Sequence, residues 1–298
     1  MGFFSKTLTF SKTLTFAAAS VLAAGLTLGS AQAADKKINI GWTSWSDAEA
    51  VTKLAKKVLE DRMGYKVDLT MADIGIQYQG IADGKLDAML MSWQPLTHKP
   101  YLDRVGQKVV DLGPMYTGAK LGWVVPTYVP EAELSSIEDL KKPEVKKKLA
   151  GKIQGIDPGS GLMQASEKAL KEYGLSDYQL VSASDAAMLS GVDRAARRDQ
   201  WIVATAWSPH WMFVKHQLRY LEDPKGALGG QETVNKLVRR GFQQDQPEAA
   251  AFLSRMTLPR GDVEKIMFEA QNSSYEQAVD NYIKANPERI DDWVSGKK

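Results

Sequence analysis

The sequence predicts an α/β fold with two lobes, and three observations support this prediction. The chain has 298 residues, of which 44% are hydrophobic and 25% are charged, so it is long and apolar enough to build two compact cores. Short apolar runs alternate with amphipathic stretches, which is typical of mostly parallel strands flanked by helices. The alternation occurs in two successive blocks, joined by an extended apolar run over 121–126. Two such blocks indicate two lobes with a cleft between them.

The first 33 residues predict a cleaved secretory signal. They contain two lysines and no acidic residue, then an apolar run over 16–28, and finally the small residues Ala31-Gln32-Ala33. This order is typical of a signal peptide, and the apolar run is too short to span a membrane. We therefore expect residues 1–33 to be removed before Ala34 and the mature protein to reach the periplasm. Because the chain has no cysteine, we expect neither a lipoprotein anchor nor disulfides.

In the first block, the pattern predicts a strand over 38–42 and then a helix that ends near Gly64. The apolar face of this helix is formed by Val51, Leu54, Ala55, Val58 and Leu59. Further strands are expected over 65–69, 86–91 and 109–112. In the second block, we expect strands and helices in the same rhythm, with strands over 152–156, 178–182 and 201–206 and helices over 162–173 and 186–196.

The chain beyond Leu221 predicts helices only. Apolar residues recur at helical spacing in two places, with Val234, Leu237 and Val238 in the first and Phe252, Leu253 and Met256 in the second. A last helix is expected near Trp293. We expect this segment to return to the first lobe, so that lobe 1 comprises 34–124 plus 217–298 and lobe 2 comprises 125–216.

Charge and motif content exclude several classes of function. The chain has 38 basic and 36 acidic residues and no basic block long enough to follow a phosphate backbone, so we expect no nucleic-acid partner. It has no HExxH pair, GxSxG elbow, Walker A loop or EF-hand spacing, and only three histidines. We therefore expect no enzyme activity, no cofactor and no metal. A secreted hydrolase with an unrecognised pair of carboxylates stays as an alternative.

Tryptophans are concentrated in segments that end predicted strands. Five of the eight lie there, namely Trp42, Trp45, Trp93, Trp207 and Trp211. In open α/β sheets, the loops after the carboxyl ends of strands face the ligand crevice, so three separate loops could place indoles in one cleft. Indole faces suit a quaternary ammonium group, which has no N–H to donate and is held by cation–π attraction. The alternative is that these indoles only fill the core.

A fourth segment predicts an anion site. The loop Ile156-Asp-Pro-Gly-Ser-Gly-Leu-Met163 follows a predicted strand and opens a helix, so the backbone N–H groups near Gly161 and Leu162 are unpaired. A carboxylate fits such a site, although the same sequence can form a plain turn. Together with the indoles, this loop suggests a zwitterion with a methylated cation at one end and a carboxylate at the other.

These segments resemble the glycine betaine-binding proteins of ABC transporters, over nearly the whole mature chain. The matching segments are Trp45-Ser-Asp47, Ser92-Trp-Gln-Pro-Leu-Thr-His-Lys99, Lys120-Leu-Gly-Trp-Val-Val-Pro126, Gly155-Ile-Asp-Pro-Gly-Ser-Gly-Leu-Met163 and Trp207-Ser-Pro-His-Trp-Met-Phe213. The resemblance implies a type II periplasmic binding protein fold, with the ligand in the cleft between two lobes, each a mostly parallel sheet flanked by helices. It also implies a monomer that captures glycine betaine for osmoprotection and delivers it to the permease subunit of an importer in the inner membrane.

The resemblance also assigns the ligand contacts. The trimethylammonium group would lie between Trp45, Trp93 and Trp207, and the carboxylate would be held by the amides of Gly161 and Leu162 and by His98. Two further candidates are Ser160 and His210, and we expect His210 to support the turn beside the indoles.

Alternative ligands stay open. These are choline, proline betaine and dimethylsulfoniopropionate. Choline binders of the superfamily lack both the histidine and the Gly-Ser-Gly loop that this chain has at His98 and 159–161. Asp47, however, lies at the position where choline binders use an acidic residue against the cation. The alternative interpretation of Asp47 is structural, as an N-cap for the helix that starts near Ala48. A regulatory sensor that docks on a receptor is a hypothesis from another class.

Overall fold

A computed structural model describes residues 1–2 and 36–296 of the chain. The predicted signal peptide and its cleavage site therefore lie outside the described residues, apart from Met1 and Gly2. The strands are β1 Lys37–Trp42, β2 Lys66–Met71, β3 Ala88–Gln94, β4 Val109–Pro126, β5 Lys152–Gln154, β6 Gln179–Val181, β7 Ala204–Ser208, β8 Leu218–Tyr220 and β9 Gln231–Arg239. The alternation of strands and helices confirms the predicted α/β class.

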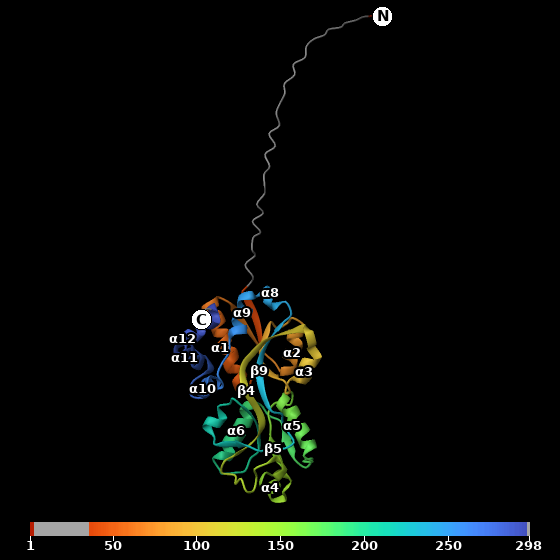
Figure 1. Cartoon of the computed structure of the whole chain (residues 1–298), viewed down its shortest axis with the longest axis vertical. Coiled ribbons are helices and arrows are strands. Elements are labelled where there is room, and N and C mark those ends of the chain that lie inside the picture. Colours follow the sequence, from red (N-terminus) through yellow and green to blue (C-terminus); the bar gives the residue numbers. More distant parts are fainter. Residues whose placement is uncertain (3–35, 297–298) are drawn as a thin grey trace. The chain divides into compact units, whose positions relative to one another are not determined.

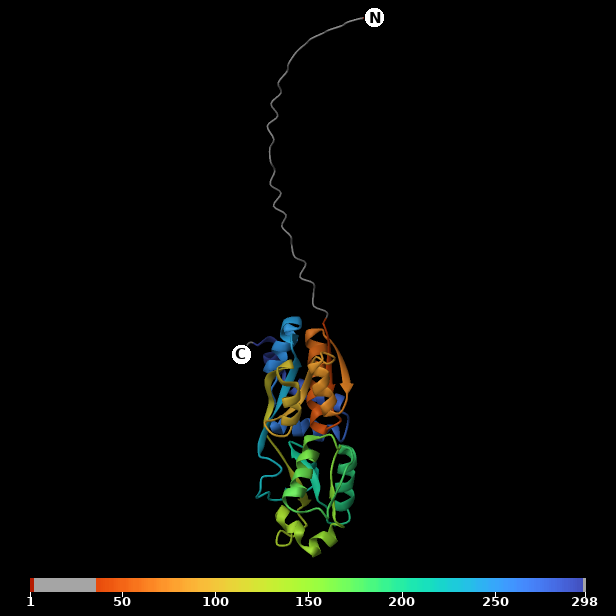
Figure 2. The ribbon, with the colours of Figure 1, turned by 90° about the vertical axis from the view of Figure 1, so that its right-hand side faces the viewer.

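The longer helices pack in two groups (Figure 1). The first lobe carries α1 Ser46–Met63, α2 Ile74–Ala82, α3 Lys99–Val105, α8 Phe242–Asp245, α9 Pro247–Arg255, α10 Arg260–Ala270, α11 Tyr275–Ala285 and α12 Pro287–Ser295. The second lobe carries α4 Pro143–Lys148, α5 Gly161–Glu172 and α6 Asp185–Ala196. A short helix, α7, spans Met212–Lys215. Figure 2 shows the same two groups from the side. Within the described ranges, no helix is both long and apolar enough to cross a membrane.

One mixed sheet passes through both lobes. Its strand order is β2-β1-β3-β9-β4-β7-β5-β6, with β8 paired to β4. The strands β2, β1 and β3 pair in parallel at one end, and β7, β5 and β6 do so at the other. The middle strands pair antiparallel. The 109–112 strand and the 121–126 run of the prediction are parts of a single strand, β4, which pairs with β9 and then with β7 and β8.

The helix predicted around Val234 is wrong, because this segment is strand β9. The strand lies between β3 and β4 in the middle of the sheet. The buried positions of β9 alternate along the strand, at Glu232, Val234, Lys236 and Val238, and Leu237 is buried as well. Because two of these alternating positions carry charged residues, the apolar residues do not show the period-2 pattern of a strand, and Val234, Leu237 and Val238 fall at helical spacing. In this part of the chain, β9 pairs with β3, and α10 and α11 pack on α1.

The helix after β1 follows the predicted pattern. Its buried face contains the five apolar residues expected from the sequence, and it ends at Gly64, whose φ of 71° lies in the left-handed region that favours glycine. Two clusters of buried residues form the interior. The smaller cluster lies in the second lobe and runs from Trp123 to Leu228. The larger cluster includes residues of both lobes, such as Trp93 and Met188, so apolar side chains of the two lobes meet between them.

Candidate ligand-binding site

All six residues that the sequence analysis placed at the centre of the site line one small cavity. The empty space at this site, part of which is open to solvent, is about 270 Å³, and it is lined by Trp45, Trp93, Thr97, His98, Leu121, Ile156, Ser160, Gly161, Leu162 and Trp207. Asp47 and His210 are not among the lining residues. No lining side chain is an aspartate, glutamate, lysine or arginine, so the cavity wall carries a formal charge only if His98 is protonated.

The three indoles come from three strand ends. Trp93 lies in β3 and Trp207 in β7, while Trp45 ends the short loop between β1 and α1 as the N-cap residue of α1. All three are at most 6% exposed. Their arrival in one cavity follows from the topology, because β3 runs in the direction of β4 and β7 runs against it, so the carboxyl ends of the two groups of parallel strands face each other. We call Trp45, Trp93 and Trp207 the aromatic cage.

Contacts with residues outside the cavity wall fix the orientation of two cage residues, Trp45 and Trp207. The Trp45 indole N–H donates to Asp157 Oδ1 at 2.7 Å, which joins the first lobe to the loop before α5. The Trp207 ring meets the edge of His210, with ring centroids 4.6 Å apart and an interplanar angle of 84°. The indole N–H of Trp207 is buried and has no hydrogen-bond partner among the described residues. Such a group in a protein interior usually has a partner, which here could be water or a ligand.

The second feature of the cavity is the N-terminus of α5. Ser160 is the N-cap residue, and its side-chain oxygen accepts the backbone N–H of Met163 at 3.2 Å, so it has a structural role besides lining the cavity. Gly161 and Leu162 are the first two helical residues, whose N–H groups have no partner within a helix. The helix dipole adds partial positive charge at this end, which favours an anion.

Gly161 lies at a close contact with the first lobe. A Cβ atom added there would be 2.5 Å from both the carbonyl oxygen and a side-chain carbon of Thr97, and 3.1 Å from the His98 ring. Any side chain at this position would therefore push the helix N-terminus away from the first lobe. The glycine is required by the close approach of the two segments rather than by a left-handed backbone.

His98 is a neutral imidazole. Its Nδ1 atom accepts the backbone N–H of Trp93 at 3.1 Å, so the ring proton is on Nε2. Tyr78 and Tyr101 pack edge-on to the ring, with centroid distances of 5.7 and 5.9 Å. Burial lowers the pKa of His98 to about 3, and a backbone hydrogen bond at Met91 opposes this shift only in part. His98 can thus offer a ligand an N–H donor without a positive charge.

Asp47 is neither the N-cap of α1 nor part of the cavity wall. The helix starts at Ser46, so Asp47 lies in its first turn, where a carboxylate interacts favourably with the helix dipole. The side chain is fully buried and accepts the hydroxyl of Tyr116 at 2.6 Å. Burial raises the pKa of Asp47 to about 6, and the hydrogen bond from Tyr116 acts in the opposite direction. The expectation that Asp47 caps the helix is therefore wrong.

His210 lies behind the cage rather than in its wall. Its Nδ1 accepts the backbone N–H of Met212 at 3.1 Å, which shapes the turn that carries Trp207 and Trp211, and its Nε2 lies 3.5 Å from Asp185 Oδ1. The sequence analysis missed three lining residues, Thr97, Leu121 and Ile156. Each of the three lies next to, or inside, a segment that the sequence had already singled out. Their position beside these segments was the signal that could have identified them.

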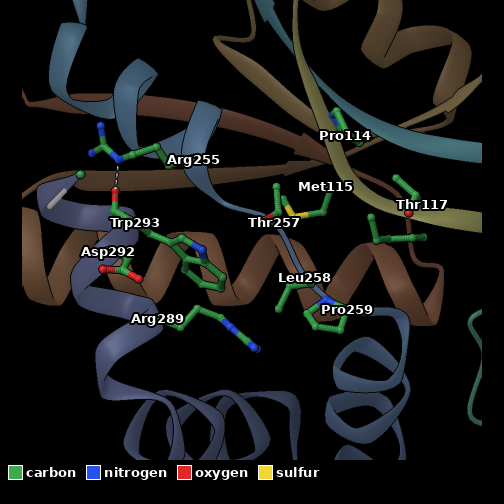
Figure 3. Close-up of a pocket in the computed structure, with 12 residues that line it drawn as sticks. Pro114, Met115, Thr117, Arg255, Thr257, Leu258, Pro259, Arg289, Asp292 and Trp293 are labelled. Carbon is green, nitrogen blue, oxygen red and sulfur yellow. Dashed lines mark hydrogen bonds between the residues drawn. The ribbon is translucent and has the colours of Figure 1, made fainter. Parts of the chain in front are cut away.

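A larger hollow, with about 1110 Å³ of empty space that is partly open to solvent, lies in the first lobe beside α12 (Figure 3). None of the predicted site residues lines it. Its Arg255 donates to the backbone oxygens of Trp293 and Val294, each at 2.8 Å, and its Arg289 pairs with Asp262. Both guanidinium groups are therefore engaged by the protein itself. Among residues 1–2 and 36–296, no three histidine, aspartate or glutamate side chains form a group that could hold a metal ion.

The chain matches one known family over most of its length. The model of the substrate-binding domain of ABC-type glycine betaine transport systems matches residues 36–285. The chain belongs to this family. Members of the family serve transport rather than catalysis, and as substrate-binding proteins of importers they act outside the cytoplasm.

Relatives of the glycine betaine-binding family support the assignment. A glycine betaine/carnitine transport binding protein of Listeria monocytogenes is 38% identical over 147 residues, which is 48% of this chain and 49% of that protein. The alignment thus spans about half the length of this relative. The structure of lactococcal OpuAC, in a closed conformation with glycine betaine, superposes with a TM-score of 0.82 at 37% identity and covers 88% of this chain and all of that chain.

A choline-binding protein of an ABC transporter, in complex with choline, also matches. Its TM-score is 0.81 at 25% sequence identity, and the match covers 88% of this chain and 92% of that chain. These neighbours confirm the type II periplasmic binding protein fold with two lobes. The proteins to which this family member is similar are thus described as binding glycine betaine, carnitine or choline.

Proposed function

We propose that this protein captures glycine betaine outside the cytoplasm and delivers it to the permease of an ABC importer. The observation that carries the proposal is the composition of the cavity wall. Three indoles, a helix N-terminus and a neutral histidine line it, and no acidic or basic side chain does. A wall of this kind suits a ligand whose net charge is zero but whose two ends are charged.

The cation end of the ligand would lie in the aromatic cage. A trimethylammonium group cannot donate a strong hydrogen bond, so indole faces are its best partners. Desolvated cation–π contacts contribute about 2 kcal/mol or more each, and the cage side chains are almost completely withdrawn from water.

The carboxylate end would lie at the N-terminus of α5. The backbone N–H groups of Gly161 and Leu162 and the Nε2–H of His98 are the donors we assign to it. Ser160 accepts a hydrogen bond from Met163, but its own O–H could still donate. Each charge-assisted hydrogen bond contributes about 1.5 to 3 kcal/mol, which makes micromolar affinity reachable after association costs.

Ligand binding would close the two lobes on each other. In this proposal Trp45, Trp93 and His98 belong to the first lobe, and Gly161 with Trp207 to the second. A site completed by both lobes binds its ligand best in the closed state and so selects that state. The lobe boundaries expected from the sequence are 34–124 plus 217–298 and 125–216. Because Leu221, Ala227 and Leu228 belong to the interior cluster of the second lobe, we propose that this lobe extends to about residue 228.

The remaining parts of the proposal rest on the sequence. They are secretion into the periplasm through a cleaved signal peptide without a lipid anchor, a monomeric state, a role in osmoprotection, and the absence of enzyme activity and cofactors. The signal-peptide pattern over 1–33, the lack of cysteine and the family assignment support them.

Choline is the second candidate, favoured by the choline complex among the structural neighbours. Choline carries a net positive charge and has no carboxylate. It would leave the donors at Gly161 and Leu162 unpaired, and the buried Asp47 carboxylate is held by Tyr116 outside the cavity wall. Proline betaine and dimethylsulfoniopropionate share the zwitterionic character and differ in bulk.

Calorimetric titration of the mature chain, 34–298, with glycine betaine and with choline tests the proposal. We expect glycine betaine to bind at least about a hundredfold more tightly, because two or more charge-assisted hydrogen bonds are lost with choline. Equal affinity, or tighter binding of choline, would refute the assignment of the carboxylate site. Binding of neither ligand would refute the proposed function.

A further inference from the structure

The helix that begins at the aromatic cage has no cap from its own side chains. The N-cap residue of α1 is Trp45, an indole that cannot accept a hydrogen bond, so the N-cap side chain does not pair with the first N–H groups of the helix. A helix N-terminus that is buried without a partner is unfavourable, because its first N–H groups lose their hydrogen bonds to water.

The missing cap comes from the second lobe, 139 positions further along the chain. Asp185 Oδ2 accepts the backbone N–H of Ser46 at 3.0 Å and the hydroxyl of Ser46 at 2.7 Å. Asp185 is 3% exposed and Ser46 is 8% exposed. Asp185 is itself the first residue of α6, so its carboxylate lies at the N-termini of two helices from different lobes. We call these two hydrogen bonds the cross-lobe cap.

The cross-lobe cap is connected to two walls of the cage. Ser46 follows Trp45 directly, and Trp45 is itself bonded to Asp157 of the second lobe at 2.7 Å. On the other side, Asp185 Oδ1 lies 3.5 Å from His210 Nε2, and the His210 ring packs against Trp207. The Asp185 carboxylate therefore contacts both Ser46, which follows the cage residue Trp45, and the ring of His210, which packs against the cage residue Trp207.

We propose that Asp185 is a positioning residue that caps α1 only when the two lobes are closed, and thereby couples closure to the arrangement of the cage. The identity of the ligand in this inference rests on the proposed function. In an open form, the Ser46 N–H and the Asp185 carboxylate are both hydrated, so the cap makes no contribution there. Its contribution therefore appears as a higher fraction of closed protein and as slower ligand release.

Substitution of Asp185 tests the coupling. Asp185→Ala is expected to weaken glycine betaine binding about 10- to 100-fold, mainly through a faster dissociation rate, because it leaves a buried N–H and hydroxyl unpaired in the closed form. Asp185→Asn keeps an oxygen that can accept both hydrogen bonds and should recover most of the affinity. Asp193→Ala is the matched control, since Asp193 lies on the same helix but pairs with Arg197 and Lys215. It should leave affinity unchanged.

A stability measurement separates coupling from a merely structural role. If Asp185 acts only in the closed form, Asp185→Ala leaves the melting temperature of the ligand-free protein unchanged and reduces only the rise produced by the ligand. A fall in the melting temperature of the ligand-free protein equal to that of the loaded protein would overturn the inference.

A ligand-independent measurement keeps this inference separate from the proposed function. The chain has no cysteine, so Lys66→Cys in the first lobe and Lys147→Cys in the second, both exposed, provide unique sites for a fluorescent donor and acceptor. Single-molecule energy transfer then reports the distance between the lobes. We expect Asp185→Ala to reduce the fraction at the closed distance at least about threefold, without ligand and at half-saturating ligand. Identical distributions in the two proteins would overturn the inference, whereas a wild type that ignores glycine betaine would contradict only the proposed function.

Discussion

At the scale of single residues, the cage tryptophans carry the largest predicted effects. Trp93→Ala and Trp207→Ala should each weaken glycine betaine binding at least about tenfold, because each removes a desolvated cation–π contact. Trp201→Ala is the control, since Trp201 contacts Lys148 in the second lobe and does not line the cavity. Calorimetry gives the three affinities. Loss of less than about threefold in both cage variants would mean that the indoles only fill the interior.

The protonation state of His98 gives a second prediction at this scale. Because burial lowers its pKa to about 3, the ring is neutral throughout the range in which the protein can be studied. Affinity for glycine betaine should therefore be constant between about pH 5 and 8.5. An affinity that falls as pH rises through this range would show instead that the histidine binds as an imidazolium ion. Titrations at four or five pH values, with a folding control by circular dichroism, distinguish the two cases.

At the scale of elements, the N-terminus of α5 depends on the absence of a side chain at Gly161. Gly161→Ala would place a Cβ atom against the backbone of Thr97, so the helix could not approach the first lobe and complete the site. We expect loss of binding by at least about two orders of magnitude, with little change in the stability of the ligand-free protein. Gly159→Ala, in the same loop, is the control, because a Cβ atom there meets nothing within 4 Å. Equal affinities of the two variants would exclude this close contact from the binding mechanism.

The elements also show where sequence patterns are informative. Helix α1 was predictable because one face is exposed and Gly64 supplies the left-handed residue that ends it. Strand β9 was not, since two of its alternating buried positions carry the charged residues Glu232 and Lys236. The continuity of β4 was also missed, because exposed residues at 111, 114 and 117 interrupt the apolar pattern while the register of the strand shifts against β9.

The residues that line the cavity could also be predicted in part from the sequence. The short segments that carry the tryptophans and the Gly-Ser-Gly loop contain the lining residues, because the carboxyl ends of the two groups of parallel strands face each other. The role of Asp185 could not be predicted, since a cap that comes from another lobe leaves no local signal in the sequence. The environment of Asp47 depends in the same way on Tyr116, which is distant in sequence.

At the scale of the whole molecule, Asp47 gives a prediction about stability and pH. Its pKa is about 6 in the folded protein and 3.8 in the reference state, so the folded protein binds more protons in this window and the contribution of Asp47 to stability falls as pH rises from 3.8 to 6. Asp47→Asn removes this dependence and keeps an oxygen for the Tyr116 hydroxyl. The free energy of unfolding of the variant, relative to wild type, should therefore rise by about 2 kcal/mol between pH 4 and pH 7.

Denaturant titrations of both proteins at each pH measure this difference. His98 acts in the opposite direction, because its depressed pKa lowers stability as pH falls below 6.5, but it contributes equally to both proteins and cancels in the comparison. A difference that stays constant with pH would contradict the assignment of a buried, shifted carboxyl at Asp47.

The central claim for the whole molecule is that a zwitterion lies with its cation in the aromatic cage and its carboxylate at the N-terminus of α5. A crystal structure of the mature protein grown with glycine betaine tests it most directly. We predict the trimethylammonium group among Trp45, Trp93 and Trp207, and carboxylate oxygens within about 3 Å of the amides of Gly161 and Leu162 and of His98 Nε2. A ligand in the reverse orientation, or one bound outside this cavity, would contradict the account.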